Sequence, residues 1–258
     1  MSLIELKNIS KSFNKNKVLD DLTIEFSLDE FVVIVGQSGC GKSTLLNLLD
    51  FSLKADSGKY FITEEKPYKN QEMLKQTVIK RIHQKSNLIE YYTVYENLKL
   101  VCIISNIDES IIDDYLERFN LKSLRDKYPN QVSVGEGQRI SLIRALLCNP
   151  LILLADEPTG SLDEKNAKDV MNTLYKNRKG KLIIVVTHNE KIKDIYGETI
   201  IRIEEGKAVV EKQKELSTKK VKISFEKPKS TKPKDVFLLN IKSLRKRKTI
   251  TVLLMVIV

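Results

Sequence analysis

Nine residues of the chain, GQSGCGKST at positions 36–44, have the types and spacing of a phosphate-binding loop, because they match G-x-x-x-x-G-K-[ST]. The glycines let successive backbone N–H groups turn toward phosphate oxygens at the positive end of a following helix. Lys42 is expected to reach the β- and γ-phosphates of a nucleotide, and Ser43 to ligate Mg²⁺. Cys40 offers either a reactive thiol or a small filler whose backbone contacts phosphate, and we favour the filler. The predicted nucleotide-binding residues of the loop are Gly36, Gln37, Ser38, Gly39, Cys40, Gly41, Lys42, Ser43 and Thr44.

Two adjacent acids end an apolar run in LILLADEP at 151–158. This arrangement predicts Asp156 near the metal ion and Glu157 near the γ-phosphate, where a carboxylate orients or deprotonates an attacking water. The alternative is an acidic turn without a chemical role. We favour the catalytic interpretation because a phosphate loop lies about 115 residues earlier in the chain.

The apolar pattern of the chain predicts the scaffold that must hold these motifs. Continuous apolar runs indicate buried strands at 31–35, 151–154 and 182–186. Helical spacing follows or precedes them at 42–50, 136–148 and 164–178. Strands that alternate with helices predict a mostly parallel sheet in an α/β domain. The phosphate loop follows the first of these strands and opens a helix, which is the context that its motif requires.

Other regions complete the expected organisation. Alternating runs at 3–9 and 22–28 predict short strands, whereas residues 90–130 show helical spacing and predict a helical insertion. The three cysteines are an odd number and lie far apart in the chain, so we expect no disulfide framework and a reducing compartment. The first residues lack the pattern of a secretory signal, so we expect that this part of the protein is not exported.

With both motifs in place, the chain resembles the nucleotide-binding domain of ABC ATPases over nearly all of residues 1–210. The resemblance implies a P-loop NTPase (RecA-like) core with an N-terminal antiparallel β subdomain and a helical subdomain, plus a basic C-terminal tail. It also implies ATP and Mg²⁺ as cofactors, ATP hydrolysis, and a head-to-tail homodimer that closes over two ATP molecules.

The resemblance assigns further roles to residues that match the family's remaining motifs. Phe13 fits the aromatic position that stacks on adenine, with Val18 beside it, although Phe13 is alternatively a core residue. Gln84 matches the glutamine loop that reaches Mg²⁺ and water, Asp163 the loop that faces the second site across the dimer, and His188 the switch histidine at the γ-phosphate. The implied catalytic residues are Glu157, His188 and Gln84, and the implied metal ligands are Ser43, Gln84 and Asp156.

The chain departs from the family in its signature motif, which is VSVGE at 132–136 instead of LSGGQ or LSGGE. The motif implies that ATP is contacted across the dimer by Ser133, Val134, Gly135 and Glu136. Val134 replaces a glycine whose missing Cβ lets the helix start approach the γ-phosphate. A β-branched residue there is expected either to push the phosphate away or to favour another backbone angle, and thereby to slow hydrolysis.

Net charge divides the chain sharply. The total is +10, but residues 207–258 hold 15 Lys and Arg against 4 Asp and Glu, so that residues 1–206 carry only −1. This distribution predicts three parts: a nucleotide-binding domain at 1–206 with its helical insertion at about 85–148, a basic linker at 207–234, and at 235–258 a juxtamembrane helix with the start of a membrane segment.

The C-terminal pattern narrows the resemblance to the macrolide-exporter and lipoprotein-release (MacB-like) group, in which a similar pattern precedes the first membrane helix of a fused permease. The matching residues are Asn240, Ser243, Leu244, Lys248 and Thr249. We therefore expect an ATPase domain at the cytoplasmic face of the cell membrane, with a fused or separate permease as partner. The alternative for this segment is a basic solvated tail.

The expected function is ATP-driven export or extraction of a lipid, peptide or antibiotic through that permease. The basic tail is expected to contact anionic lipid, and no nucleic-acid partner is expected. Two alternatives stay open. One is a soluble ABC-type ATPase that acts on nucleic acid or ribosomes, which the positive net charge would suit. The other is a regulatory nucleotide-binding module with low turnover, which Val134 would suit.

Overall fold

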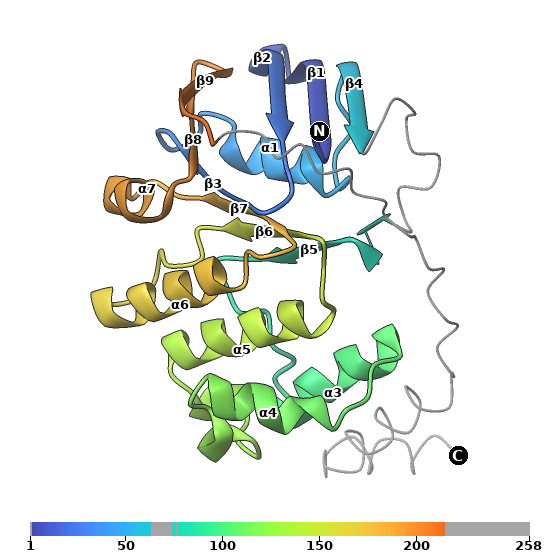
Figure 1. Ribbon diagram of the computed structural model, residues 1–258, viewed down its shortest axis with the longest axis vertical. Coiled ribbons are helices and arrows are strands. Elements are labelled where there is room, and N and C mark those ends of the chain that lie inside the picture. The colour runs from blue at the N-terminus through green and yellow to red at the C-terminus, as the bar shows by residue number, and fades with distance from the viewer. Residues whose placement is uncertain (1, 63–73, 76, 215–258) are drawn as a thin grey trace, which may run out of the picture. The chain divides into compact units, whose positions relative to one another are not determined.

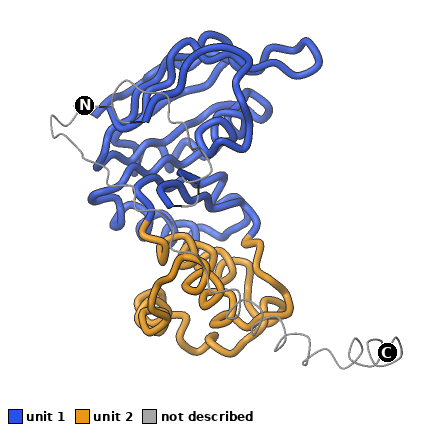
Figure 2. The backbone as a smooth tube through the Cα atoms, turned by 90° about the vertical axis from the view of Figure 1, so that its right-hand side faces the viewer, with its two compact units in different colours: residues 1–85, 150–227 blue, residues 86–149, 228–258 orange. Residues whose placement is uncertain are grey.

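The computed structural model describes residues 2–62, 74–75 and 77–214, whose helices and strands are labelled in Figure 1. The chain forms two compact units, coloured separately in Figure 2. The first unit comprises residues 1–85 and 150–227, and the second comprises residues 86–149 and 228–258.

The first unit is built on a six-stranded sheet with the order β5-β6-β7-β3-β8-β9. Its strands are β3 (Glu30–Val35), β5 (Ile79–Ile82), β6 (Ile152–Asp156), β7 (Leu182–Val186), β8 (Thr199–Glu204) and β9 (Lys207–Lys212). All neighbouring strands are parallel except β9, which is antiparallel to β8. The three apolar runs in the sequence became β3, β6 and β7, and all residues of β3 and β7 are buried, as in parallel sheets covered on both faces.

A smaller antiparallel sheet stands beside it with the order β2-β1-β4. Its strands are β1 (Ile4–Phe13), β2 (Asn16–Phe26) and β4 (Ser57–Ile62). Together the two sheets confirm the expected P-loop NTPase core with an N-terminal antiparallel β subdomain. Helix α1 (Lys42–Leu49) lies between them in Figure 1. Its buried leucines join Val32 and Ile34 of β3 in one hydrophobic core with residues of the small sheet.

The opposite face of β3 packs against two other helices, α6 (Glu164–Lys176) and α7 (Glu190–Tyr196). The Phe31 ring lies 5.3 Å from that of Tyr175 and 6.4 Å from that of Tyr196, measured between centroids. Alternate side chains of β3 therefore serve the two faces of the sheet. This double packing fixes the carboxyl end of β3, where the phosphate loop begins.

The second unit is helical in its described part, residues 86–149. It contains α3 (Val94–Ser105), α4 (Ile111–Arg118) and α5 (Val134–Leu147), with short 3₁₀ helices at Lys122–Leu124 and Pro129–Gln131. The three α-helices contact one another in pairs. Thr93 caps α3 in a reciprocal arrangement with Glu96, which satisfies two backbone N–H groups at the helix start.

One boundary differs from our expectation. Residues 207–212, which we predicted to begin the basic linker, form strand β9 and pair with β8. Glu205 and Gly206 both have positive φ, at 49° and 78°, and make the tight turn between the two strands. The sequence did not indicate this hairpin, because its second strand is rich in Lys and Glu and therefore has the composition of a linker. An edge strand of a sheet often carries charges on its exposed side.

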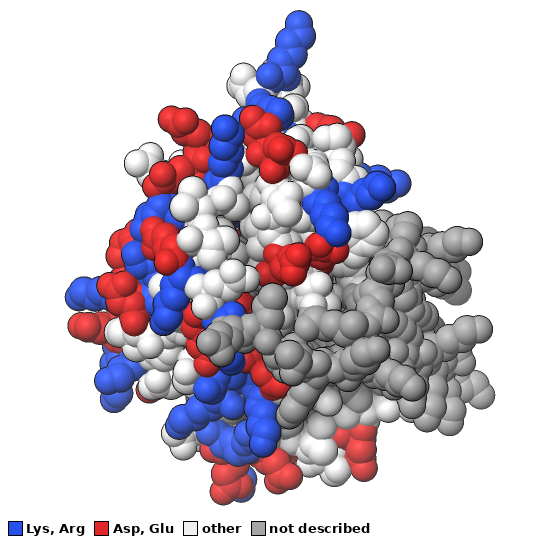
Figure 3. Space-filling model, turned by 45° about the horizontal axis from the view of Figure 1, so that its top comes forward, with Lys and Arg blue, Asp and Glu red and all other residues white. Residues whose placement is uncertain are grey.

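No helix within the described residues is long enough and apolar enough to cross a membrane. The rest of the predicted linker beyond Lys214, and the predicted juxtamembrane helix and membrane segment, lie outside these residues. On the face shown in Figure 3, basic and acidic side chains of the described residues are interspersed, in keeping with the balanced charge of residues 1–206.

Candidate functional site

The phosphate loop connects β3 to α1 and depends on glycine at its end. Gly41 is the N-cap of α1 with φ 108°. A Cβ at this position would lie 2.8 Å from the carbonyl oxygen of Val18 and 3.0 Å from a methyl carbon of Leu19. Gly41 is therefore required both by its backbone angle and by close packing. The same contact places Val18 of β2 directly against the loop. Such a cradle of backbone N–H groups at a helix start fits the phosphates of a nucleotide.

Lys42, the first residue of α1, carries its charge inside the loop. The residue is only 7% exposed, and its ammonium donates to the carbonyl oxygens of Gly36 at 2.7 Å and Gln37 at 2.6 Å. The Cys40 sulfur lies 3.8 Å from the same nitrogen. A buried ammonium that is bonded to the loop itself is well placed to exchange these carbonyls for phosphate oxygens.

The two acids lie at the carboxyl end of β6, as the sequence predicted. Asp156 ends the strand, and Glu157 follows with φ 48°, in the left-handed region that residues other than glycine seldom adopt. The Glu157 N–H donates to the carbonyl of Val186 at 2.9 Å, which ties this conformation to the end of β7. Strained backbone of this kind persists where the surrounding structure holds it, and it concentrates at functional positions.

His188 lies two residues after β7 and meets Glu157. Its Nδ1 is 2.9 Å from the Glu157 carboxylate. The Glu157 side chain is 18% exposed, whereas that of His188 is 68% exposed. When Glu157 is ionised, Nδ1 must carry the proton that it donates to the carboxylate. The carboxylate thus holds the imidazole in one tautomer, with Nε2 as the nitrogen that remains for a ligand.

Gln84 lies against the turn that follows Glu157. A Cβ at Gly160 would approach the Gln84 side-chain nitrogen to 3.1 Å, and the Gly160 N–H donates to the Glu157 carbonyl at 3.1 Å. The structure therefore brings Gln84, Glu157 and His188 together. The hydroxyl of Ser43, the amide of Gln84 and the carboxylate of Asp156 are oxygen donors, the type that Mg²⁺ prefers when phosphates supply its other ligands.

Arg81 is a charged residue at this site that sequence reasoning missed. It lies in β5, three positions before Gln84, and its guanidinium contacts Asp156 at 2.6 Å, Asp50 at 3.0 Å and Asn47 at 2.6 Å. The signal was the pair Lys80-Arg81 inside the otherwise apolar run VIKRI. Its partners, however, come from α1 and β6 and are not evident from spacing.

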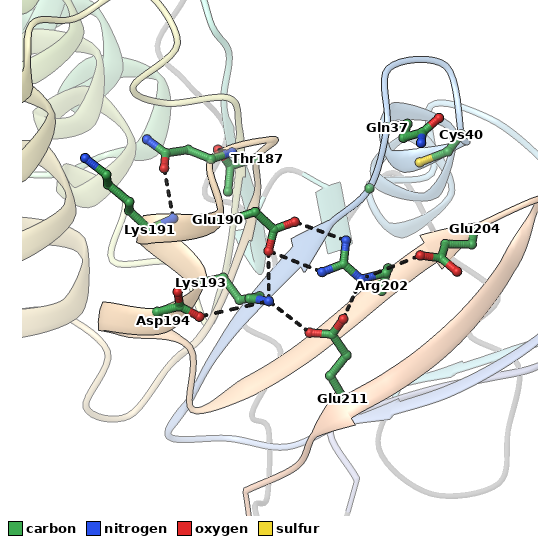
Figure 4. A network of polar contacts seen from close by, with 12 residues as sticks. Gln37, Cys40, Thr187, Glu190, Lys191, Lys193, Asp194, Arg202, Glu204 and Glu211 are labelled. Atoms are coloured by element: carbon green, nitrogen blue, oxygen red, sulfur yellow. Dashed lines mark hydrogen bonds and ion pairs between the residues drawn. The ribbon is translucent and has the colours of Figure 1, made fainter.

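A second network follows His188 along the chain and is drawn in Figure 4. Glu190 begins α7 and receives two bonds from the guanidinium of Arg202 in β8, at 3.0 Å and 3.2 Å. Arg202 also contacts Glu211 of β9, and Lys193 contacts both glutamates. Hydrogen bonds from Arg202 lower the pKa of Glu190 to about 2. Arg202 pairs with Val35, the last residue of β3, so the network joins the end of β3 to the start of α7.

Asp163 and Phe13 have local partners. Asp163 is the N-cap of α6 and accepts from the N–H of Asn166 at 2.9 Å, and this bond lowers the pKa of Asp163. Phe13 ends β1 and is 45% exposed, with the Lys11 ammonium 5.5 Å from the centre of its ring. Its exposure excludes the alternative of a core residue. Adenine stacking by Phe13 and the dimer role of Asp163 stay predictions.

The signature residues lie in the second unit, at the start of α5. Ser133 is the N-cap and forms a capping box with Glu136: its N–H donates to the Glu136 carboxylate at 2.7 Å, and its Oγ accepts from the Glu136 N–H at 3.3 Å. The Ser133 N–H lowers the pKa of Glu136. Gly135 is buried, whereas Val134 is 65% exposed as the first residue of the helix. Val134 is not among the residues with positive φ, so its β-branched side chain causes no strain there.

A family model described as ABC transporter matches residues 19–160. The chain is 33% identical over 225 residues to the macrolide export ATP-binding/permease protein MacB of Chlorobaculum tepidum, which covers 83% of this chain but only 34% of that protein. It is 35% identical over 219 residues to the bacitracin export ATP-binding protein BceA of Halalkalibacterium halodurans, covering 80% of this chain and 87% of that protein.

A solved structure shares the fold over the same region. It is the dimeric ATP-binding cassette MJ0796 in a post-hydrolysis state bound to ADP and Pi, which superposes with a TM-score of 0.73 at 31% identity. The match covers 81% of this chain and 98% of the cassette. The chain thus spans nearly all of a complete cassette, but about a third of MacB.

Proposed function

The chain belongs to the ABC transporter family of ATP-binding proteins, and from this premise we propose that it hydrolyses ATP to drive export or extraction of a lipid, peptide or antibiotic through a permease. Within that role it works at the cytoplasmic face of the cell membrane. ATP binds between two copies of the chain arranged head to tail. The observation that carries the proposal is the pair formed by Glu157 and His188 at 2.9 Å.

The pair provides the chemistry that hydrolysis needs. Glu157 orients the attacking water or takes a proton from it. This water would lie beside the γ-phosphate of a nucleotide bound in the phosphate loop. His188 keeps the carboxylate in place and offers Nε2 to the phosphate. Lys42 supplies positive charge to the phosphate oxygens. Ser43, Gln84 and Asp156 would hold a Mg²⁺ ion, which would supply neutralising charge at the phosphates.

The permease and the class of cargo rest on resemblance. MacB is an export protein with an ATP-binding part and a permease in one chain, and BceA is an ATP-binding protein of bacitracin export. The residues that resemble the MacB-like junction, 240–249, lie outside the described part of the chain. The +11 charge of residues 207–258 supports contact of this tail with an anionic membrane surface.

A second candidate function is a regulatory nucleotide-binding module with low turnover. It is favoured by Val134, which presents an apolar, 65% exposed side chain at the helix start where the family has glycine. The third possibility raised by the sequence, action on nucleic acid, has no comparable support, because residues 1–206 carry a net charge of −1.

The test replaces Glu157 with glutamine and measures ATP turnover and ATP binding. Loss of the base is expected to lower turnover by about 100-fold or more, whereas ATP binding is retained because the phosphate loop is intact. Glu164→Gln is the matched control, since Glu164 is an exposed acid in the first turn of α6. Turnover in Glu157→Gln equal to that of the control would contradict the assignment. Measurable turnover in the parent that Glu157→Gln abolishes would exclude the regulatory alternative.

A further inference from the structure

Arg81 carries a charge in β5, which is an edge strand of the six-stranded sheet, and yet this charge is largely shielded from solvent. Its side chain is only 11% exposed. The side chains of its two acidic partners, Asp50 and Asp156, are 8% and 18% exposed. One guanidinium nitrogen contacts Asp50 and the other contacts Asp156, so that a single cation lies between two carboxylates from different elements.

The charge balance of this cluster gives Arg81 its role. Two carboxylates that share one guanidinium are close neighbours, and without the cation they would repel each other in a poorly hydrated place. The guanidinium fork fits two carboxylates at once, which the ammonium of lysine does less well. Asn47 fixes the fork from α1 through a hydrogen bond of 2.6 Å. One oxygen of Asp156, Oδ2, accepts the bond from the Arg81 guanidinium.

We propose that Arg81 is the built-in counter-ion of the metal-binding carboxylate Asp156, so that the acidic pair does not take up Mg²⁺ by itself and Asp156 meets the metal only together with nucleotide phosphates. This inference rests on the proposed function for the identity of the metal. Arg81 is a positioning residue, since it acts through Asp156. Gln84 lies three positions after Arg81, so the strand that carries the counter-ion leads directly to a second expected metal ligand.

A cavity adjoins the Asp50 side of the cluster. Asn47, Asp50 and Arg81 line a cavity of ≈ 530 Å³ together with Ser52, Lys75, Ile79, Lys80 and His83. When Arg81 is replaced by a neutral side chain, a hydrated divalent cation is therefore able to reach Asp50 from this side, and it reaches Asp156, which does not line the cavity, across the space that the guanidinium leaves. The proposal thus makes a prediction for the metal alone, in the absence of any nucleotide.

The experiment measures the melting temperature of the parent and of Arg81→Gln in EDTA and in MgCl₂ without nucleotide, with ionic strength matched by NaCl. In EDTA the variant is expected to melt lower than the parent, because Asp50 and Asp156 are no longer neutralised. MgCl₂ at ten times the dissociation constant is expected to raise its melting temperature by about 3–6 °C, and that of the parent by less than about 1 °C.

Three variants separate charge from packing. Asp50→Asn keeps the pair of Arg81 with Asp156 and is expected to respond to MgCl₂ like the parent. Arg81→Lys keeps the charge, so it too is expected to show no gain. The double variant Asp50→Asn with Arg81→Gln leaves one acid and is expected to lose most of the gain of Arg81→Gln.

Two results would overturn the proposal: an equal gain from MgCl₂ in the parent, or no gain in Arg81→Gln. If Arg81→Gln does not fold in EDTA, recovery of the fold on addition of MgCl₂ supports the proposal and failure to recover contradicts it. Since neither nucleotide nor turnover enters the measurement, its failure would leave the assignment of Glu157 untouched. Failure of the Glu157→Gln test, in turn, would not change how the effect of MgCl₂ on the melting temperature of Arg81→Gln is interpreted.

Discussion

Val134 is the residue at which VSVGE departs from the LSGGQ or LSGGE pattern, and we propose that this departure affects the rate of hydrolysis. Its backbone is that of an ordinary helix start, and the capping box of Ser133 and Glu136 is complete around it. The departure therefore changes the surface that the helix start presents and not its local fold. In the proposed dimer, Val134 would place a branched apolar side chain where an N–H group and the helix dipole would otherwise approach phosphate closely.

We predict that Val134→Gly raises ATP turnover. Removing the side chain lets the start of α5 come closer to the γ-phosphate, and recovery of about 1.4 kcal/mol in the transition state corresponds to a tenfold increase in kcat. The measurement is steady-state ATP hydrolysis of the two proteins. Val134→Ala is the control, because it keeps Cβ and is expected to lie between them. Turnover of Val134→Gly no greater than that of the parent would count against the idea.

Elements position these residues through bonds between segments that are distant in the sequence. Helix α7 begins two residues after His188, and its first residue, Glu190, is held by Arg202 of β8 and by Lys193 of its own helix. Glu211 of β9 binds both of these cations, and Glu204 and Asp194 lie at the edge of the cluster. The hairpin of β8 and β9 thus fixes the start of α7 and, through it, the loop that carries His188.

We predict that Arg202→Gln lowers the melting temperature by about 2–4 °C at neutral pH and loses this effect in acid. The folded-state pKa of Glu190 is about 2, below its ordinary value of 4.5. The bond therefore contributes fully above the ordinary value, and its contribution disappears as the pH falls toward 2. Melting curves from pH 7 to pH 2.5 should show parent and variant converging below about pH 4.5.

Arg202→Lys is the control for this series, because it keeps the charge but not the paired geometry, and should lie between the two. The double variant with Glu190→Gln should melt close to or slightly below Arg202→Gln at neutral pH, since Arg202→Gln has already removed the bonds between the guanidinium and Glu190, and the double variant loses in addition the contact of Glu190 with Lys193. A difference between parent and Arg202→Gln that stays constant down to pH 2.5 would show that Glu190 is not the group responsible.

The elements differ in how far the sequence predicts them. The runs that became β3, β6 and β7 were evident because strands buried on both faces are continuously apolar, and the motifs at their ends were evident because backbone geometry restricts the residue types. Strand β9 was missed because a charged edge strand resembles a linker in composition. Arg81 and Arg202 were missed because their partners are brought close only by the fold, and no periodicity reports such a contact.

The proposed function requires a dimer, because the residues expected to contact one ATP molecule are divided between two copies of the chain. The phosphate loop, Glu157 and His188 lie in the first unit, and Ser133 with Val134 lies in the second. In the proposed head-to-tail dimer each ATP is bound by the first unit of one copy and contacted by the second unit of the other. A two-fold dimer of this kind contains two equivalent composite sites. Its arrangement is testable without a structure of the complex.

We predict that two inactive variants restore activity when they are mixed. Lys42→Met disables the phosphate loop of its own copy, and Val134→Glu places a negative charge at an exposed helix start, where it repels phosphate without disturbing the capping box. In a mixed dimer, the copy with Lys42→Met offers an intact signature to the intact phosphate loop of the other copy, so one of two sites works. With equal amounts, random pairing and independent sites, the mixture should reach about a quarter of the parental ATPase rate per copy. If the signature instead serves the nucleotide bound to its own copy, every site in the mixture carries one of the two defects, and the rate stays at the level of the separate variants.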